Sequence, residues 1–433
     1  MIFSKIRGVY ISEHKGHKEL SSHTPYVEYL TPEFVYIPLI EQDTVCESLV
    51  KVGDIVKFGQ LIAKKTGKFS SPIHSSVSGE VMSIDCKMWH SSGKMVPTIQ
   101  IKNDFLNTKD ESIKDNNVDK LQKDDLVEII RSCGVVGLGG SGFPTYVKYM
   151  GNNKIDIVII NAVECEPYIS DNYILMKNQM NTLINGIKYI MKAVNAPKAT
   201  IAIKKNKIEL INKMKPYFDN EPTISMTLVK DEYPAGWEKY LVQHIVGKNY
   251  KSLPSEVGAV VNNAATAIAI ANAVEHNMPL VEKMITVSGR GLKDPKNVYV
   301  KIGTKLNDII QFIGGYADDL GDAFFIAGGP MTGKSIIFDS LIVNRSLNSV
   351  IVMPKVMDES KYNCLGCGKC SEHCPAFLSP IQIKNALEAG DRELLQEYHA
   401  EKCMQCGLCS YICPSRIELT ESVGKAKALL MKR

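Results

Sequence analysis

Eight of the twelve cysteines of the chain fall between Cys364 and Cys413. They form two runs, CLGCGKCSEHCP and CMQCGLCSYICP, and each run has the spacing C-x2-C-x2-C-x3-C-P. In bacterial ferredoxin runs of this spacing, three thiolates bind one [4Fe–4S] cluster and the fourth binds the other cluster. The spacing therefore predicts two clusters, one held by Cys364, Cys367, Cys370 and Cys413 and the other by Cys403, Cys406, Cys409 and Cys374.

Structural zinc is the alternative use of so many thiols. Zinc sites use two C-x2-C pairs with four ligands per ion, and the C-x3-C-P ending has no purpose in them. Between the two runs, helical spacing interrupted at Gly390 predicts a helix, a turn and a second helix. The remaining cysteines, Cys46, Cys86, Cys133 and Cys165, lack cluster spacing and are expected to be ordinary thiols.

Residues 328–335, GGPMTGKS, match the phosphate-binding pattern G-x4-G-K-[ST]. That pattern works only between a strand and a helix, because the helix N-terminus supplies N–H groups to the phosphates. Here the following residues are β-branched and lack a helical period, and Pro330 removes one N–H from the loop. We therefore expect a tight turn between strands, not the phosphate loop of an ATPase.

Residues 137–142, GLGGSG, match the dinucleotide-binding pattern G-x-G-x-x-G. A helix-like stretch around Leu126 to Ile130 precedes them, and the strand-like stretch KIDIVIINAVECEP follows. A regular dinucleotide-binding fold has the opposite order, so the pattern alone is a weak indication.

The surroundings of this second loop carry a specific resemblance. GLGGSGFPTYVK, INAVECEPY, YPAGWEK and VVNNAAT, in that order, resemble the flavin- and NADH-binding domain of the complex I 51-kDa subunit family. Nearly the whole chain resembles the RnfC family, the NADH-side subunits of membrane-associated Rnf complexes. Leu138, Val163 and Trp237 depart from the 51-kDa pattern, which has an arginine at the first position and acids at the other two.

The resemblance implies FMN, NAD(H) and a set of binding residues. Residues at the flavin would be Gly137, Gly139, Gly140, Gly142, Lys148, Asn161, Glu164, Gly236, Asn262, Asn263 and Thr266. Phe143 would stack on the dinucleotide, with Glu166 and Glu238 at its ribose hydroxyls. No side chain is expected to act as a catalytic acid or base.

The fold implied is a multidomain α/β and α+β chain, and 433 residues are too many for one core. The expected parts are a barrel-sandwich, lipoyl-like domain at 1–106, a linker at 107–124, a Rossmann-like FMN/NADH domain at 125–280, a β-grasp (SLBB-like) domain at 281–355 and an α-helical two-[4Fe–4S] ferredoxin-type domain at 356–433. The linker is polar, so we expect it to be exposed and mobile.

Composition narrows the setting. A net charge of +4 without a long basic stripe gives no case for nucleic acid. The opening residues lack the apolar core of a secretory signal. The longest uncharged run, Val257 to Val274, contains three asparagines and is expected to be a buried Ala-rich helix. Any membrane contact would thus be peripheral, and the resemblance to RnfC implies a cytoplasmic chain that is peripheral on the inner face of the membrane.

The cysteine runs predict two [4Fe–4S] clusters, and the resemblance implies an oxidoreductase subunit that passes electrons between NAD(H), FMN and these clusters, as the NADH-side subunit of an Rnf ferredoxin:NAD oxidoreductase. Its partners would be NADH and either other Rnf subunits or a soluble redox protein. Two alternatives stay open from sequence. One is a soluble RnfC-like protein that feeds another reductase, of the proline-reductase-associated type. The other is a cluster-bearing scaffold without catalysis.

Overall fold

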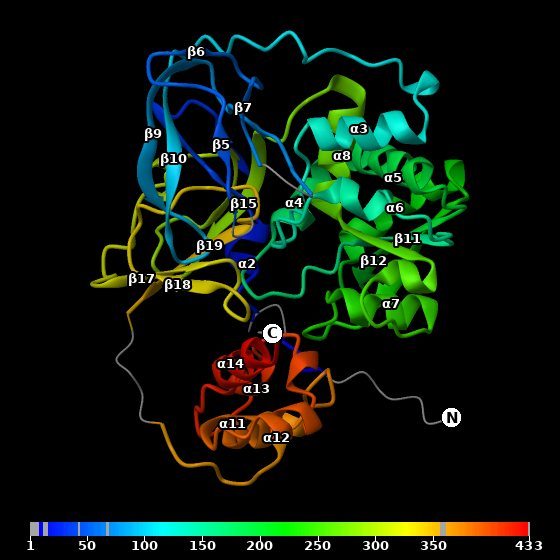
Figure 1. The fold of residues 1–433 in the computed structure, drawn as a ribbon, viewed down its shortest axis with the longest axis vertical. Coiled ribbons are helices and arrows are strands. Elements are labelled where there is room, and N and C mark those ends of the chain that lie inside the picture. Colours follow the sequence, from blue (N-terminus) through cyan, green and yellow to red (C-terminus); the bar gives the residue numbers. More distant parts are fainter. Residues whose placement is uncertain (1–7, 12–15, 42–43, 66–68, 356–360, 432–433) are drawn as a thin grey trace.

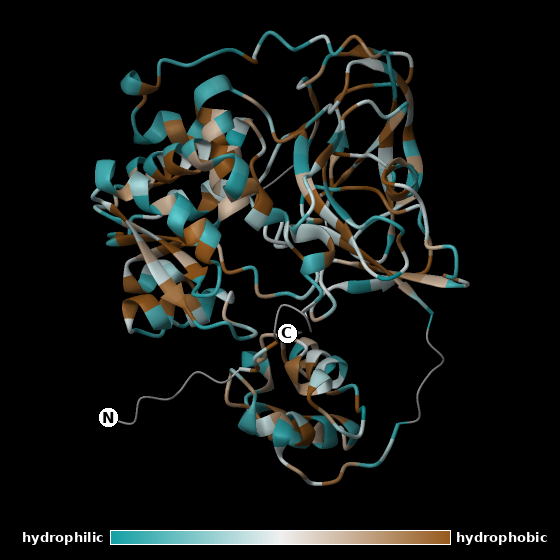
Figure 2. Cartoon of the chain, turned by 180° about the vertical axis from the view of Figure 1, so that it is seen from behind, coloured by the Kyte–Doolittle hydropathy of each residue, from teal (hydrophilic) through white to brown (hydrophobic). Residues whose placement is uncertain are grey.

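The computed structural model describes residues 8–11, 16–41, 44–65, 69–355 and 361–431. Figure 1 shows a β-rich half, a half built on a parallel sheet covered by helices, and a smaller helical lobe beneath them. Hydrophobic residues concentrate along the strands of the sheets, and hydrophilic residues dominate the outer helix faces (Figure 2). Within the described residues, no helix combines the length and the apolar character needed to cross a membrane.

The N-terminal part is built from short strands. They are β2 (Phe34–Pro38), β3 (Ile40–Glu41), β4 (Thr44–Val45), β5 (Glu47–Ser48), β6 (Ile55–Val56), β7 (Leu61–Lys64), β8 (Ile73–His74), β9 (Gly79–Trp89) and β10 (Met95–Asn103). One sheet has the order β2-β10-β9-β6 and another the order β5-β7-β8. Ile37 and Ile101 from the first sheet share a core with Ile62 from the second. Two sheets around one core confirm the predicted barrel sandwich.

The expected linker at 107–124 contains one short helix and makes polar contacts with residues 274 and 276. The helix is the 3-10 helix η1 (Val118–Lys120). Asn116 Nδ2 donates to the carbonyl of Val274 at 2.9 Å, and Asp115 Oδ1 lies 2.6 Å from His276 Nδ1. The segment is exposed as predicted, but its polar side chains fasten it to the end of the helix that carries Val274 and His276.

A parallel sheet forms the centre of the next part. Its elements are α3 (Lys123–Ser132), η2 (Thr145–Tyr149), β11 (Ile157–Asn161), α4 (Asp171–Asn178), α5 (Met180–Val194), β12 (Ala199–Lys204), α6 (Ile208–Asn220), β13 (Ile224–Val229), α7 (Glu238–Val246), η3 (Pro254–Val257), β14 (Ala259–Asn263) and α8 (Ala264–His276). The strand order is β13-β12-β11-β14, and all pairs are parallel. Val158 and Ile160 pack in the core with α5 and α8, whereas Ile159 packs with α7. Helices therefore cover both faces, as the Rossmann-like prediction requires.

The prediction of one helix over Val257–Val274 is wrong at its beginning. Residues 259–263 form β14, which pairs with β11, and the helix α8 begins only at Ala264. The Asn263 side chain accepts a hydrogen bond from Ala265 N at 2.9 Å and caps this helix. β-Branched residues before a strong N-cap therefore favoured a strand followed by a helix.

A six-stranded sheet forms the third part, in the order β1-β16-β15-β19-β17-β18. Its elements are α2 (Glu19–Ser22), β1 (Val27–Tyr29), β15 (Glu282–Ser288), β16 (Lys296–Lys301), α9 (Leu306–Phe312), β17 (Ala323–Ala327), β18 (Lys334–Ile336) and β19 (Ser349–Pro354). β1 pairs in parallel with β16 although it comes from the expected 1–106 domain. The predicted boundary at residue 106 therefore does not separate the barrel from the six-stranded sheet, because β1 precedes that boundary and forms an edge of the six-stranded sheet.

The C-terminal lobe is helical. Its elements are α10 (Lys369–Glu372), α11 (Pro380–Glu388), α12 (Arg392–Glu397), η4 (Ala400–Lys402), α13 (Leu408–Tyr411) and α14 (Leu419–Met431). Gly390 has φ +69° between α11 and α12, which confirms the predicted helix, turn and helix. Ile383, Leu395 and Val423 form its small core.

Candidate flavin and iron–sulfur sites

The glycine loop 137–142 is a tight turn between α3 and η2. Gly142 N donates to Gly137 O at 3.0 Å, and Gly137 N donates to Phe143 O at 2.8 Å. Gly140 and Gly142 have φ of +98° and +59°, a region in which side chains are strained. The order of elements is helix, loop and then strand, as the sequence predicted.

The loop touches the beginning of α8. Leu138 N donates to Thr266 Oγ1 at 2.9 Å. A Cβ on Gly139 would lie 3.2 Å from Asn263 Nδ2, and one on Gly142 would lie 3.0 Å from Ser346 Cβ. Side chains at these glycines would therefore press on the loop's neighbours.

Several predicted polar residues gather at the carboxyl edge of the parallel sheet. Asn161 ends β11 and stands in register with Asn263, the last residue of β14. Asn161 Nδ2 donates to Gly236 O at 2.6 Å, which ties the strand to the segment before α7. Asn262 is 3% exposed, and its Nδ2 makes no well-formed hydrogen bond among the described residues, although the buried Tyr149 hydroxyl is its neighbour. A buried amide donor without a well-formed hydrogen bond is costly, so this edge fits a polar ligand such as FMN.

Phe143, Lys148 and Glu238 line one cavity of about 340 Å³, together with apolar residues that include Leu253 and Pro254. Lys148 Nζ donates to Val261 O at 2.8 Å and lies 3.9 Å from Glu238 Oε2. Desolvation lowers the pKa of Lys148, and the charge of Glu238 opposes that effect. An apolar cavity of this size, lined also by the two lysines Lys123 and Lys148 and by one carboxylate, fits a small organic ligand.

A second cavity of about 420 Å³ lies on the other side of the loop, lined by Gly140, Ser141 and Gly142. His74 faces it from β8 of the barrel, and Arg345 faces it from the connection between β18 and β19. Burial and the nearby charge of Arg345 lower the pKa of His74 to about 3, so its ring is neutral. Within the described part of the chain, no cluster of potential metal ligands surrounds His74, whose site is a buried seam between domains.

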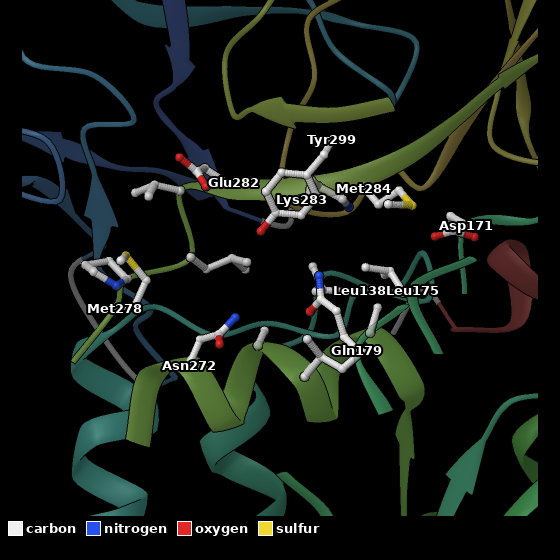
Figure 3. Close-up of a pocket in the computed structure, with 16 residues that line it drawn as sticks. Leu138, Asp171, Leu175, Gln179, Asn272, Met278, Glu282, Lys283, Met284 and Tyr299 are labelled. Atoms are coloured by element: carbon white, nitrogen blue, oxygen red, sulfur yellow. The ribbon is translucent and has the colours of Figure 1, made fainter. Parts of the chain in front are cut away.

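A third, smaller cavity of about 50 Å³ lies behind Leu138, in the seam between α8 and the six-stranded sheet. Figure 3 shows Asn272 and Gln179 on the helical side and Lys283 and Tyr299 on the sheet side. Lys283 is buried there and donates to Arg345 O at 2.8 Å. The glycine loop is therefore backed, at Leu138, by side chains of α8 and of the six-stranded sheet.

Two predicted glutamates have structural partners instead of lining the cavity beside Phe143. Glu164 Oε1 accepts hydrogen bonds from Asn172 N and Tyr173 N, at the beginning of α4. Glu166 Oε2 accepts from Met331 N at 3.1 Å, and its Oε1 accepts from Thr332 Oγ1. Desolvation raises the pKa of Glu166, and these hydrogen bonds oppose that shift.

The match to the phosphate loop of ATPases is a hairpin, as predicted. β17 and β18 pair antiparallel, with Ala327 opposite Lys334. Gly333 N donates to Gly329 O at 2.7 Å and closes the turn. No helix follows, so the helix N-terminus that would bind phosphate is missing from this described segment.

In the helical lobe, one of the two predicted cysteine sets gathers at one place. Cys374, Cys403, Cys406 and Cys409 line a single cavity. Leu378 N donates to Cys374 Sγ at 3.4 Å, and Gln405 N donates to Cys403 Sγ at 3.3 Å. Backbone N–H donors to sulfur are the usual surroundings of an iron–sulfur cluster. The four cysteines line the cavity, although within the described residues no three potential ligands are grouped as closely as one metal ion requires.

Burial makes free thiols of this set weak acids. It raises the pKa of Cys406 to about 12 and that of Cys409 to about 11. Iron binding removes such protons, because the ligand is the thiolate.

The other set is more open. Cys364 and Cys367 are exposed, and Cys370 and Cys413 are partly exposed. Gly366 N donates to Cys364 Sγ at 3.4 Å, as in the buried set.

Sequence reasoning missed two residues that shape these sites. Tyr233 is 1% exposed, and its hydroxyl donates to Cys406 O at 2.5 Å. Lys18 is buried, lies 3.8 Å from Glu164 Oε2 and donates to Ile169 O. Burial lowers the pKa of Lys18 to about 8. Tyr233 lies in the quoted YPAGWEK segment, which was the available signal, whereas Lys18 stands in a polar stretch typical of a surface.

Family models match each part of the chain. The Nuo51 FMN-binding domain matches residues 130–272, the RnfC barrel sandwich hybrid domain residues 4–106, the SLBB domain residues 284–335 and the 4Fe-4S dicluster domain residues 355–414. The predicted FMN and [4Fe–4S] cofactors and the predicted fold class are thereby confirmed.

Curated relatives cover most of the chain. A subunit of the Na⁺-translocating ferredoxin:NAD⁺ oxidoreductase complex of Acetobacterium woodii is 33% identical over 374 residues, 84% of each chain. The corresponding subunit of the proton-translocating complex of Clostridium ljungdahlii is 34% identical over 391 residues, 88% of this chain and 83% of the relative. The chain belongs to the RnfC family. Membership confirms the resemblance drawn from the sequence motifs.

Other RnfC relatives are longer, and the match covers 50% of the corresponding subunit of the ion-translocating oxidoreductase complex of Vibrio cholerae at 30% identity. Among solved structures, an NAD⁺-reducing [NiFe]-hydrogenase in the H2-reduced state has a TM-score of 0.50 and 16% identity over 73% of this chain and 64% of that chain. This likeness concerns the fold alone.

Proposed function

We propose that this RnfC-family chain is the NADH-side electron-transfer subunit of an ion-translocating ferredoxin:NAD oxidoreductase. The observation that carries the proposal is the presence, in one chain, of an FMN-binding domain and a dicluster lobe whose cysteine loop packs on that domain. Relatives named as subunits of such complexes support it. The chain would be peripheral on the inner face of the membrane, bound to other subunits.

The glycine loop is proposed to lie against FMN. Without side chains at 137, 139, 140 and 142, backbone and ligand can approach closely. Asn161, Gly236, Asn262, Asn263 and Thr266 would surround the flavin from the carboxyl edge of the sheet, with Lys148 supplying positive charge. The Nδ2 of Asn262 would gain a well-formed hydrogen bond to an acceptor.

The cavity beside Phe143 is proposed to receive NAD(H). Phe143 would stack on the nucleotide, and Glu238 would accept from a ribose hydroxyl. Glu164 and Glu166 would not touch the nucleotide directly. They would position α4 and the 328–333 hairpin, whose backbone N–H groups their carboxylates accept from.

When bound, FMN converts the two-electron chemistry of a hydride into single electrons, which are what [4Fe–4S] clusters carry. The residues of the chain orient the nucleotide, exclude water from the apolar cavity and hold the cysteine loops in place. No side chain has to exchange a proton with the substrate.

Anaerobic purification with cofactor analysis tests the proposal. We expect about eight iron atoms per chain, four for each cluster, with one FMN and bleaching of the flavin by NADH. Reduction of a viologen dye by NADH should follow. Folded, iron-loaded protein without flavin would support the scaffold alternative, and Cys406→Ser should lose one cluster's iron.

A further inference from the structure

A segment from the N-terminal part of the chain, residues 16–22, runs along the loop 162–170 between β11 and α4. Gly16 O accepts a hydrogen bond from Tyr168 N at 2.6 Å. The segment belongs to the part that matches the barrel sandwich model, whereas the loop belongs to the part that matches the FMN-binding model. We call this segment the clamp, because it holds a loop that begins directly after Asn161, at the carboxyl edge of the parallel sheet.

Lys18 is the buried cation of the clamp. It is 4% exposed, and its ammonium donates to Ile169 O and lies 3.8 Å from Glu164 Oε2, so one side chain bridges two points of the loop. Among the described residues, Glu164 Oε2 is buried and accepts no hydrogen bond. A buried carboxylate that loses its cation is costly, so Lys18 fixes where Glu164 can lie. Ser21 Oγ lies 2.7 Å from Ser170 Oγ and adds a contact at the end of the loop.

Hydrogen bonds continue from Glu164 to the glycine loop. Glu164 Oε1 accepts from Asn172 N at 3.0 Å. Asn172 is 4% exposed, and its Oδ1 accepts from Ala265 N at 3.2 Å, in the first turn of α8. The next residue, Thr266, accepts from Leu138 N at 2.9 Å. A series of contacts therefore leads from the clamp to the glycine loop.

We propose that the clamp is part of the flavin site, and that Lys18 is a positioning residue that holds the glycine loop in its binding geometry through Glu164 and the beginning of α8. The proposal rests on the proposed function and adds to it a residue from outside the FMN-binding domain. That domain is then incomplete without the N-terminal part of the chain. Since β1 follows the clamp and pairs with β16, the clamp also connects the flavin site to the six-stranded sheet.

Binding of FMN to the deflavinated full-length chain tests this role. Lys18→Met removes the charge and nearly keeps the length of the side chain. We expect FMN to bind about tenfold more weakly, because a binding loop that has lost its support no longer holds the productive geometry. Quenching of flavin fluorescence measures the affinity, and the visible circular dichroism of the bound flavin should change with its orientation. Equal affinity in Lys18→Met and the unmodified chain would overturn the proposal.

Lys301→Met is the matched control. Lys301 is also 4% exposed, and its Nζ lies 2.5 Å from Glu282 Oε1, but the pair belongs to the six-stranded sheet. This variant loses a buried lysine from an ion pair as Lys18→Met does, so a general loss of stability affects both. We expect it to bind FMN as the unmodified chain does. Equal losses of affinity in the two variants would contradict a specific role of Lys18.

A double variant covers the case in which Lys18→Met does not fold. Lys18→Met/Glu164→Gln leaves no buried carboxylate without its cation, and the side-chain amide oxygen at position 164 can still accept from Asn172 N. We expect a folded chain that still binds FMN several-fold more weakly, because the bridge to Ile169 O is lost. Unchanged FMN affinity in the folded double variant would overturn the positioning role.

Hydrogen exchange at residues 137–142 separates the clamp from the proposed function, because it needs no flavin. In the flavin-free chain, Lys18→Met should speed exchange of the Leu138 amide several-fold, and Lys301→Met should leave it unchanged. Faster exchange confined to the loop 162–170, with the glycine loop as in the unmodified chain, would overturn the proposal. If the unmodified chain bound no FMN, the proposed function would fail, and exchange would still decide whether the clamp holds the glycine loop.

Discussion

Residues 137–142 and 328–333 are both glycine-rich, and both match phosphate-binding patterns, but the structure uses them differently. The first loop lies at the carboxyl edge of a parallel sheet and contacts the beginning of α8. The second closes an antiparallel hairpin, leads into strand β18 instead of a helix and packs on Gly407. The flanking elements, more than the glycines, decide what such a pattern does.

The largest expected difference between the loops concerns flavin binding. Gly139→Val should reduce bound FMN roughly tenfold, because overpacking against Asn263 costs about 1–3 kcal/mol. Flavin per chain, measured by fluorescence after acid release, checks this. Gly139→Ala should lose less, and Thr332→Val in the second loop should keep its flavin. Full flavin in Gly139→Val would contradict the close approach of loop and ligand.

The second loop should matter for stability. Glu166→Ala removes the acceptor of Met331 N and Thr332 Oγ1, and hydrogen bonds to a charged group contribute about 1.5–3 kcal/mol. Glu166→Ala should unfold at a lower temperature than the unmodified chain. The midpoint temperature of Glu166→Gln should lie between those of the unmodified chain and Glu166→Ala. A variant as stable as the unmodified chain would mean that the hairpin is held by packing alone.

The stability of the buried site of His74, beside the glycine loop 137–142, should be sensitive to acid. His74 binds its proton far less readily in the folded chain, where its pKa is lowered from 6.5 to about 3. The unfolded state therefore gains a proton first as pH falls below 6.5, and stability decreases by about 1.4 kcal/mol per pH unit down to pH 3. Denaturant midpoints between pH 7 and 5, followed by circular dichroism, measure the slope. His74→Asn should flatten it, and an equal slope in both proteins would contradict this origin.

Lys334 should have the smallest effect. It is exposed, and its Nζ donates to Ser92 O at 3.3 Å. Lys334→Ala should leave flavin content and NADH oxidation unchanged and alter stability by less than about 0.5 kcal/mol. Mg²⁺-dependent ATP hydrolysis that disappears in this variant would restore the phosphate-loop interpretation.

Local spacing predicted the features that depend on neighbours in the chain. The cysteine runs, the hairpin at 328–333 and the turn at Gly390 each follow from residues within a dozen positions of one another. The resemblance of four short motifs supplied the family, which no periodicity could have indicated. The individual roles of the flavin-site residues stay predictions.

Features that join distant segments did not follow from the sequence. The hydrogen bond from Tyr233 to Cys406 links residues 173 positions apart. Nothing in the sequence around either residue predicts that the other is its partner. The carboxylate of Glu166 was expected at a ribose, but its nearest donors come from a hairpin 165 positions later. The start of α8 does not follow from its alanine-rich composition, because the Asn263 side chain caps the helix and the residues before it form β14.

The pairing of β1 with β16 also bears on how the protein is made. Val27 stands opposite Val298 in the register of these parallel strands. At a synthesis rate of about 5–20 residues per second, the partner strand leaves the ribosome roughly 15–55 s after β1. During that interval the nascent chain carries an open strand edge, which is prone to wrong pairing. Completion of this sheet must therefore wait until most of the polypeptide has been translated.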